Sequence, residues 1–398
     1  MTKQVRHDVD EALEAAHQVL RNNLHGGYGG LPRTAAWGYP EPYTRDLLIS
    51  GLAALVTREQ ALMASLERVL EVLAQNQSPL GHIPSLVHDP ERRGASDTTP
   101  LFLVTLAFFR RVTGQMDFLR AAAEKALRWM DYQSPENRVI VQQQPTTDWR
   151  DEQWVPGYGL YVNTLVYAYL RLFGEADKAR LLYDRMHRFA VSAQARSPYG
   201  ERAGRAHVHP GLVLPRKPYF AFWSFKEFSN ERFDLMGNSL AILSGLATPA
   251  RARWIVSWVE RSSKRLRARG VLAPDLPPCI IPFVYYGDPD YQRRSARFSP
   301  PGCYLNGGVW PFVCAFYAAA LVAAGRHQLA RRKLAALTDL VRMSKDASLE
   351  FGFNEWHQAQ TGRPKGEDWQ SWSAAMYIYA AKCVRRGTTP LFDDVREG

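Results

Sequence analysis

The sequence predicts an all-α fold in which helical hairpins close into one double-layered barrel. Apolar residues recur at helical spacing in about twelve successive segments. These segments pair off along the chain, and each pair ends in a long loop rich in glycine, proline and aromatic residues. Six hairpins in a closed ring account for this pattern. Inner helices would then surround an axis, and the loops would gather at one end around a deep pocket.

The expected helices follow one another without a linker between them. They cover residues 8–24, 46–57, 60–75, 99–113, 117–132, 158–172, 175–193, 234–247, 250–269, 309–324, 327–343 and 369–385. Glycine and proline punctuate the loops, as in GGYGGLPRTAAWGYPEPYTRD, PDLPPCIIPFVYYGDPDY and RFSPPGCYLNGGVWP. No serine- or glycine-rich hinge and no short repeat marks a boundary. We therefore expect a single domain over residues 1–398.

The composition is that of a globular protein with a large core. Apolar residues make up 46% of the 398 residues and charged residues 22%, which excludes a disordered chain. No stretch approaches the roughly 18 uninterrupted apolar residues that a membrane span needs. Charges run through residues 1–20, where a secretion signal would have an apolar centre. We expect no membrane contact and a cytoplasmic location.

The net charge of +11 raises the question of a nucleic-acid partner. Basic residues concentrate in two helix-like stretches, Arg251–Arg269 and Arg326–Lys345. Tryptophans interrupt the first stretch, as in WIVSWVERSSKRLRARG, so we expect its apolar face in the core and its arginines on a solvated outer face. No helix-turn-helix, RNP or zinc-finger pattern is present. The sequence therefore indicates no nucleic-acid partner.

Neither the cysteines nor the histidines have the spacing of a metal site. Cys279, Cys303, Cys314 and Cys383 lack a CxxC pair and are too few for a disulfide scaffold, so we expect buried free thiols. The histidines, which include His82, His207, His209 and His357, show no pattern such as HExxH. We expect no metal and no cofactor.

The loops concentrate tryptophan next to acids and amides, which is the composition of a carbohydrate pocket. Flat aromatic rings stack on the apolar faces of a sugar, while carboxylates and amides bind its hydroxyls. For any single tryptophan, a place in the core is the simpler interpretation; it is their position beside acids that indicates function. The loop tryptophans are Trp37, Trp149, Trp154, Trp310, Trp356, Trp369 and Trp372.

Three loops carry acids in this aromatic setting. They are YTRD at Tyr43–Asp46, TTDWRDEQW at Thr146–Trp154 and FGFNEW at Phe351–Trp356. Glycoside hydrolysis needs two carboxyl groups on either side of one bond, one protonated and one ionised. The loops supply candidates, but spacing alone does not select them, because most of the 39 acids are expected to be solvated partners of arginine.

Four motifs resemble those of the alkaline/neutral invertases, in the same order. They are YPEPYTRDLLISGLAAL, RFDLMGNSLAILSGLAT at Arg232–Thr248, NGGVWP at Asn306–Pro311, and FNEW followed by QSW at Gln370–Trp372. The resemblance implies that Arg45 and Asp46 bind the terminal sugar.

A fifth segment, TTDWRDEQWVPGYG, resembles the Trp-Met-Asp segment of the amylo-α-1,6-glucosidase part of bacterial debranching enzymes and of related processing-glucosidase-like hydrolases. This resemblance implies that Asp151 is the general acid and Glu355 the general base. Together the motifs span about residues 39–380 and imply an (α/α)6 barrel that hydrolyses with inversion of configuration.

Two departures from these families concern the substrate. Tyr161 stands where the invertases and debranching enzymes have a glutamate, in GLYVNTLVYAYL. The histidine that precedes NGG in invertases is absent, because the run here reads CYLNGG. These departures affect the inference of sucrose specificity more than the assignment of the two catalytic carboxylates.

The acids also have simpler interpretations, which the sequence leaves open. Any of Asp148, Asp151 and Glu152 could be the acid, although Asp148 could instead cap a turn or pair with Arg150. Like charge and the flanking Trp149 and Trp154 would raise the pKa of Asp151 and keep it protonated. Glu355 could pair with an arginine or a lysine, namely Arg363 or Lys365.

The remaining candidates carry similar alternatives. Asp97 in GASDTT resembles an acid that orders the pocket in these barrels, but it could also be a helix N-cap. Asn306 could bring backbone close to a sugar hydroxyl or form a plain turn before a helix at Pro311. The full set of expected substrate contacts is Tyr43, Arg45, Asp46, Asp97, Trp149, Trp154, Asn306, Trp310, Trp356, Gln370 and Trp372.

The sequence thus predicts an inverting exo-acting glycoside hydrolase of a small α-glucoside, with sucrose first. The alternative is an α-1,6-glucosidase or another α-glycoside hydrolase that acts on a glucosyl or mannosyl conjugate. A sugar epimerase would need paired histidines, which do not show, and a binding or scaffold protein would leave the acid loops unexplained. The expected partner is a small oligosaccharide or glycoside, and a homo-oligomer stays open.

Overall fold

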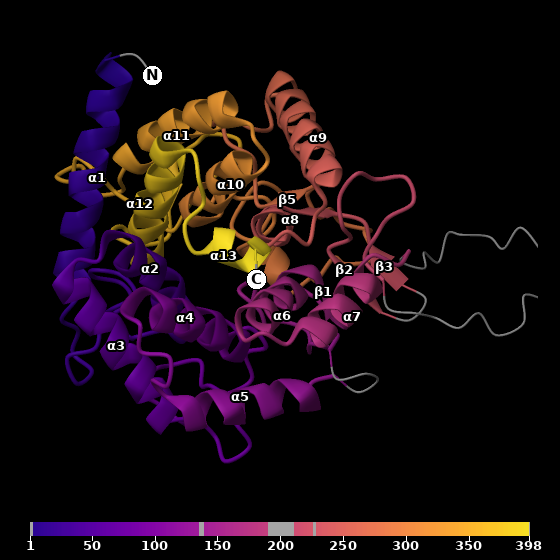
Figure 1. Ribbon diagram of the computed structural model, residues 1–398. Helices are drawn as coiled ribbons and strands as arrows, with labels where there is room; N and C mark the ends of the chain where they lie inside the picture. Colours follow the sequence, from indigo (N-terminus) through magenta and orange to yellow (C-terminus); the bar gives the residue numbers. More distant parts are fainter. Residues whose placement is uncertain (1–2, 135–138, 190–210, 226–227, 398) are drawn as a thin grey trace, which may run out of the picture.

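An inner ring of helices forms the centre of the molecule (Figure 1). The computed structural model describes residues 3–134, 139–189, 211–225 and 228–397. Each inner helix contacts the next one along the chain, and the last contacts the first, so the ring is closed. The inner helices are α2 (Thr44–Thr57), α4 (Thr98–Thr113), α6 (Leu160–Leu172), α8 (Leu235–Leu243), α10 (Pro311–Ala323) and α12 (Ser371–Arg386).

An outer layer of helices covers this ring. Its members are α1 (Lys3–Asn23), α3 (Gln60–Gln75), α5 (Arg120–Tyr132), α7 (Ala176–Met186), α9 (Pro249–Ala268) and α11 (His327–Arg342). The two layers differ in pattern: α10 is buried from Pro311 to Val322, whereas α5 buries only a stripe at Ala123, Ala126 and Met130. A helix that is apolar all round belongs in a core, and one with a single apolar stripe belongs on its surface. The predicted barrel of hairpins is confirmed.

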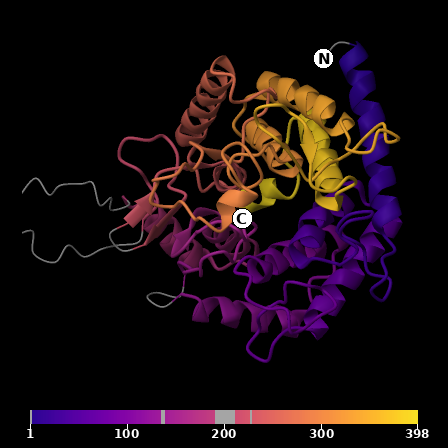
Figure 2. The same ribbon diagram turned by 180° about the vertical axis from the view of Figure 1, so that it is seen from behind.

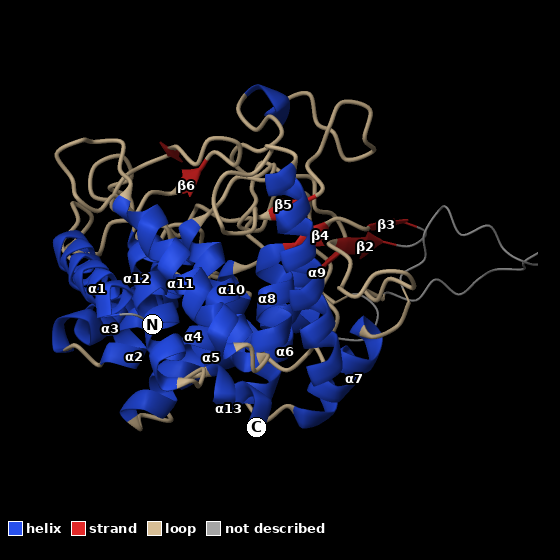
Figure 3. Ribbon diagram, turned by 90° about the horizontal axis from the view of Figure 1, so that it is seen from above, coloured by secondary structure: helices blue, strands red, loops and turns tan. Residues whose placement is uncertain are grey.

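The long loops lie at one end of the barrel (Figure 3). They lead into the N-terminal ends of the inner helices, while short turns join the hairpin partners at the other end. Seen from behind, the chain runs once round the ring, from indigo α1 to yellow α12, and these two helices pack together (Figure 2). Functional side chains on the long loops therefore share one end of the molecule.

A short helix that the sequence analysis did not predict, α13 (Phe392–Glu397), lies at the end opposite the loops (Figure 3). Phe392 packs against Phe108 and Tyr379, with ring centroids 5.6 and 6.3 Å away. Arg396 donates a hydrogen bond to the carbonyl of Leu243, at the C-terminal end of α8. This helix packs over the barrel end opposite the loops.

Short antiparallel strands hold the long loops together. One sheet has the order β1 (Tyr158–Gly159), β2 (Trp223–Phe225) and β3 (Phe228–Asn230), with Tyr158 opposite Ser224. Two further pairs are β4 (Phe233–Asp234) with β5 (Ile280–Ile281), and β6 (Trp356–His357) with β7 (Pro364–Lys365). A 3-10 turn covers Ser295–Arg297. Strands of two or three residues are too short to give a periodic signal, so the sequence analysis missed them.

The other sequence expectations can be checked on the described residues. On α9, Arg253, Arg261 and Arg265 are exposed, so the predicted solvated face is confirmed. Trp258 packs against Phe233 at 5.0 Å, but Trp254 is 59% exposed, so only one of the two tryptophans lies on the core side. The four cysteines are free thiols, but only three are buried, because Cys303 is partly exposed. No helix in the described part is long and apolar enough to cross a membrane. His207, His209 and the end of the expected 175–193 helix lie outside the described residues.

Candidate active site

Three carboxyl groups stand at the loop end of the barrel without a cationic partner. Asp46 is in the first turn of α2, Asp151 is in the loop before α6, and Glu355 directly precedes β6. Asp46 and Glu355 are buried, whereas Asp151 is exposed. None of the three forms a salt bridge within the part of the chain that the structure describes, so the alternative pairing of Glu355 with Arg363 or Lys365 is not formed there.

Burial and mutual repulsion raise the pKa values of these three acids, which we call the carboxyl cluster (Asp46, Asp151 and Glu355). Burial, then the charge of Asp46, raises the pKa of Glu355 to about 8. Burial also raises the pKa of Asp46 to about 7, although Arg45 opposes the rise. Desolvation by surrounding atoms raises the pKa of Asp151, again against Arg45. Each carboxyl group thus influences another, so the three titrate as a coupled set.

A tight turn presents Asp151. The backbone N–H of Gln153 donates to the carbonyl of Arg150 at 2.9 Å, which places Asp151 and Glu152 at the two central positions. The Gln153 side chain also donates to the carbonyl of Leu305 at 2.8 Å. In the described part of the chain the Asp151 carboxyl group itself is held by no hydrogen bond. Its oxygens are therefore available to a ligand.

Glycine at position 366 makes room for Glu355 in the β6–β7 hairpin. The backbone N–H of Glu355 donates to the carbonyl of Glu367 at 3.0 Å. Gly366 has φ +69°, and a Cβ atom there would lie 2.2 Å from Oε2 of Glu355. Only glycine combines that backbone conformation with so close an approach.

Two tyrosines that the sequence analysis did not select lie beside these carboxyl groups. The charge of Glu355 is the largest cause that raises the pKa of Tyr39. The pKa of Tyr304 is raised by burial and then by Asp151 and Glu355. Tyr304 is therefore near both predicted catalytic acids. Its place two residues before the matched motif NGGVWP was the available signal.

Arg45 is committed to an ion pair with the buried Asp97. Its Nε and Nη2 donate to the two carboxylate oxygens of Asp97 at 2.5 and 3.1 Å, and Nη2 also donates to the carbonyl of Asp148 at 3.0 Å. Tyr161 donates its hydroxyl to Asp97 at 3.3 Å. Asp97 occupies the N-cap position of α4, as the alternative interpretation expected, but its side chain makes no cap hydrogen bond and binds Arg45 instead. The Tyr161 hydroxyl thus helps to hold the Asp97 carboxylate in place.

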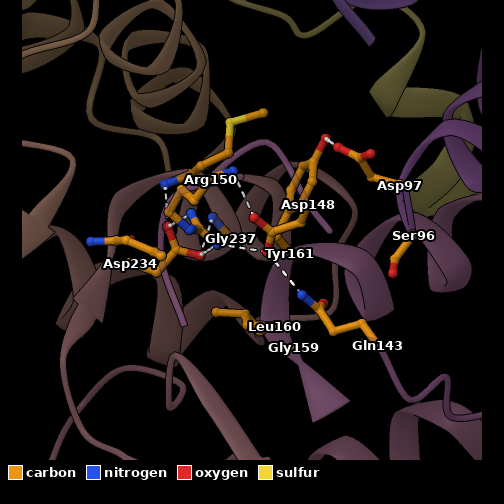
Figure 4. A network of polar contacts seen from close by, with 12 residues as sticks. Ser96, Asp97, Gln143, Asp148, Arg150, Gly159, Leu160, Tyr161, Asp234 and Gly237 are labelled. Carbon is orange, nitrogen blue, oxygen red and sulfur yellow. Dashed lines mark hydrogen bonds and ion pairs between the residues drawn. The ribbon is translucent and has the colours of Figure 1, made fainter. Parts of the chain in front are cut away.

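A second buried ion network lies next to the first (Figure 4). Arg150 donates to Asp234 at 2.9 Å and to Asp148 at 3.3 Å, so the alternative pairing of Asp148 with Arg150 is confirmed. Asp148 also accepts from the backbone N–H of Arg150 at 2.7 Å and from Gln143 at 3.1 Å. Asp148 is therefore fully engaged, which leaves Asp151 and Glu152 as the acids of this loop without a hydrogen bond or salt bridge among the described residues.

The predicted aromatic contacts divide into a buried cluster and a rim. Trp149, Trp310 and Trp372 are buried, and each packs edge to face or stacked with Phe312 or with another of the three. The indole N–H groups of Trp149 and Trp372 are buried without a hydrogen-bond acceptor among the described residues. This packing favours the core interpretation for these three rings. Their contact with substrate stays a prediction.

The rim residues other than Gln370 are more accessible. Trp154 is 46% exposed, and Trp356 is half-buried with its ring 5.8 Å from that of Tyr304. Tyr43 is half-buried at the start of α2, and Gln370 is buried at the start of α12. These four residues come from three loops, because Trp356 and Gln370 share the connection between α11 and α12, and all four lie at the same end of the barrel.

A cavity of about 230 Å³ adjoins the turn that carries Asp151. Glu152, Gln153 and Trp154 form one wall of it, and Asn306 contributes to the lining. The Asn306 side chain is occupied, because it accepts from the N–H of Val284 at 2.6 Å and donates to two backbone carbonyls. Its geometry is that of a residue that shapes a turn. The other lining residues are Phe222, Val284, Tyr286, Asp290, Tyr291, Gln292, Ser295, Ala296, Ser299, Pro300 and Pro301.

The chain is similar to glycoside hydrolases in part of its sequence and in its fold. Residues 282–373 match the mannosylglycerate hydrolase MGH1-like glycoside hydrolase domain. A GH63 mannosylglycerate hydrolase from Thermus thermophilus, solved with Tris and D-glycerate, has a TM-score of 0.64 at 15% identity and covers 92% of this chain and 99% of its own. A glycosidase variant solved with glucose has a TM-score of 0.61 at 14% identity, with 97% and 99% covered.

Curated relatives include plant invertases. Cytosolic invertase 1 of Oryza sativa subsp. japonica is 32% identical over 152 residues, which is 37% of this chain and 25% of the invertase. Alkaline/neutral invertase CINV2 of Arabidopsis thaliana is 30% identical over 154 residues, with the same two shares. The chain resembles the six-hairpin glycosidases. The match spans about a quarter of the length of these curated relatives, and the solved structures, at such low identity, show the fold alone.

The family match covers one side of the site. The matched region, residues 282–373, contains Glu355, Gly366 and Tyr304, whereas Asp46 and Asp151 lie outside it. The resemblance to alkaline/neutral invertases that the motifs indicated is confirmed by these relatives, and the matches support a glycoside hydrolase. Within the described residues, no group of three histidine, cysteine or acidic side chains could hold a metal ion.

Proposed function

We propose that this chain is an inverting, exo-acting glycoside hydrolase that cleaves an α-glucosidic bond in a small substrate such as sucrose. The observation that supports the proposal most is the carboxyl cluster, three acids that lack a salt bridge within the described residues and whose pKa values are raised by burial and by one another. Paired carboxyl groups with raised pKa values are the machinery of glycoside hydrolysis.

In the proposed reaction, Asp151 gives its proton to the glycosidic oxygen as the bond from that oxygen to the anomeric carbon breaks. Glu355 takes a proton from a water molecule as the water oxygen bonds to the anomeric carbon from the opposite face. The products are the free sugar with inverted configuration and the protonated leaving group. Asp46 and Arg45 orient the terminal sugar, with Arg45 held in place by Asp97.

The opposite assignment, with Glu355 as acid and Asp151 as base, is favoured by one observation. The pKa of Glu355 reaches about 8 in the free protein, so Glu355 is protonated near neutral pH. The two assignments differ in how they treat α-glucosyl fluoride, whose leaving group needs no proton. We expect Asp151→Asn to retain hydrolysis of this fluoride and Glu355→Gln to lose it. The reverse result would exchange the two roles.

A second candidate substrate is a glycoside of an anionic group such as glycerate. It is favoured by the domain match and by the mannosylglycerate hydrolase among the structural neighbours. The cavity beside Asp151 argues for a neutral leaving group instead, because among the described residues no lysine or arginine lines it and Glu152 does. Like charges would repel a carboxylate there.

A panel of substrates decides between these candidates. Sucrose, isomaltose, glucosylglycerate and mannosylglycerate are incubated with the protein, and released glucose or mannose is measured. We expect turnover of a neutral glucoside, with sucrose first. Turnover of the glycerate conjugates alone would establish the second candidate, and release of no sugar from any compound would refute glycoside hydrolysis.

The proposal includes three further points. The barrel over residues 1–398 acts as one catalytic domain, which the closed ring of inner helices supports. The protein works in the cytoplasm, which the similarity to cytosolic invertase 1 supports. Its partner is a small oligosaccharide or glycoside, and light scattering in solution will decide whether it forms a homo-oligomer.

A further inference from the structure

Arg150 is a fully buried arginine directly before the proposed acid. Its guanidinium bridges two carboxylates from distant parts of the chain, Asp148 in its own loop and Asp234 at the start of α8. It also lies over the rings of Trp149 and Phe222, at 4.9 and 4.5 Å from their centroids. Few degrees of freedom remain for this side chain.

The backbone of Arg150 is fixed as well. Its N–H donates to Asp148 and its carbonyl accepts from the N–H of Gln153, so Arg150 is the first residue of the turn that carries Asp151. Asp234 in turn accepts from the N–H groups of Met236 and Gly237 at 3.1 Å each, which caps α8. Figure 4 shows this continuous path from the acid loop to the N-terminus of an inner helix.

We propose that Arg150 is a positioning residue: by binding Asp148 and Asp234, it fixes the turn that aims the Asp151 proton at the leaving group. The assignment rests on the proposed function of Asp151. A mobile acid donates its proton to the leaving group inefficiently. Proton transfer requires the correct hydrogen-bond distance and direction at the moment of bond cleavage. Arg150 does not itself touch the substrate in this role.

The role predicts a dependence on the leaving group. When the acid is badly placed, cleavage slows for a leaving group that needs a proton. Cleavage of the fluoride is little affected, because fluoride departs without a proton. A purely structural arginine would have no such dependence, because loss of folded protein or of substrate binding reduces turnover of both substrates alike. The comparison therefore separates positioning from stability.

The experiment compares Arg150→Met with wild type on sucrose and on α-glucosyl fluoride. We expect kcat for sucrose to fall at least tenfold more than kcat for the fluoride. Lys333→Met is the matched control. Lys333 is also buried in an ion network, 3.1 Å from Glu260 and 3.0 Å from Asp275, but it lies in the outer layer on α11. Lys333→Met should lower the melting temperature and reduce both rates by the same factor.

Two milder substitutions test the same inference if Arg150→Met does not fold. Arg150→Lys keeps the charge without the forked geometry, and Asp234→Asn keeps an oxygen for the α8 cap but weakens the ion pair. We expect both to show the same preference for the fluoride, to a smaller extent. Equal losses on the two substrates in the folded variants would overturn the role of Arg150. If wild type hydrolysed neither substrate, nor any other compound of the panel, the proposed function itself would fail.

Discussion

Replacement of Glu355 by glutamine should stabilise the protein and inactivate it. The pKa of Glu355 is raised from 4.5 to about 8 because the side chain is buried beside Asp46. A carboxyl group whose pKa is higher in the folded than in the unfolded state contributes to the free energy of unfolding. This contribution is fully present below the unfolded-state pKa and is lost as the pH rises through the folded-state pKa. Ionised Glu355 therefore opposes folding at alkaline pH.

The size of the effect follows from the shift. One pKa unit corresponds to about 1.4 kcal/mol, so the cost of the ionised group is on the order of 5 kcal/mol above pH 8. With an unfolding entropy of roughly 2.1 cal/mol/K per residue, this free energy corresponds to about 6 °C in melting temperature for a chain of this length. Glu355→Gln is neutral at every pH and escapes the cost.

Calorimetry from pH 4 to pH 9 measures the difference between the variant and wild type. We expect almost no difference in melting temperature at pH 4, where the wild-type carboxyl is neutral in both states, and a gain of several degrees in the variant at pH 9. Glu124→Gln, an exposed acid on α5, is the control and should show no such trend. Since loss of a general base removes about 10²–10⁴ in rate, turnover should fall at least that far. A melting difference that is absent, or equal at all pH values, would refute the electrostatic account of this site.

Three further substitutions test the site. Asp151→Asn should abolish sucrose hydrolysis with an unchanged melting temperature, because the side chain is exposed and bears the proton; activity within tenfold of wild type would remove it from the mechanism. Asp46→Ala should lower kcat/KM at least about tenfold, since a charge-assisted bond to a buried hydroxyl is worth about 1.5–3 kcal/mol; a lower melting temperature with normal kinetics would make Asp46 structural. Gly366→Ala should lower kcat by displacing Glu355, whereas Gly362→Ala, at the same φ of +69° but with its nearest Cβ contact at 3.6 Å, should not; equal kinetics in the two glycine variants would contradict the packing argument.

The helices were predictable because the two layers have different apolar patterns. The inner helix α10 is an unbroken apolar run, and the outer helix α5 has a single apolar stripe. The apolar pattern of each helix therefore predicts the layer to which it belongs. The terminal helix α13 was missed because six residues are too few for periodicity. The strands were missed for the same reason, although they fix the loops of the site.

The site was predictable only where a motif marks it. Asp151 and Glu355 were selected by resemblance, and the structure leaves both without a salt bridge in its described residues. The partnership of Arg150 with Asp234 spans 84 positions and joins two loops through side chains alone, so no local pattern reveals it. The Ser-Asp-Thr run before an apolar helix correctly marked Asp97 as the N-cap residue of α4, but it could not show that Arg45 of α2 takes its carboxylate.

The most direct test of the central claim is the configuration of the first sugar released. Proton NMR can follow hydrolysis of sucrose, or of the α-glucoside that the substrate panel identifies, from the first minute. An inverting pair of carboxyl groups stands roughly 6.5–9.5 Å apart with water between them, and it releases β-glucose from an α-glucoside. We expect the β-anomer first, with the α-anomer growing in only by mutarotation. Initial release of α-glucose would contradict the account, because it would require a retaining mechanism at this site.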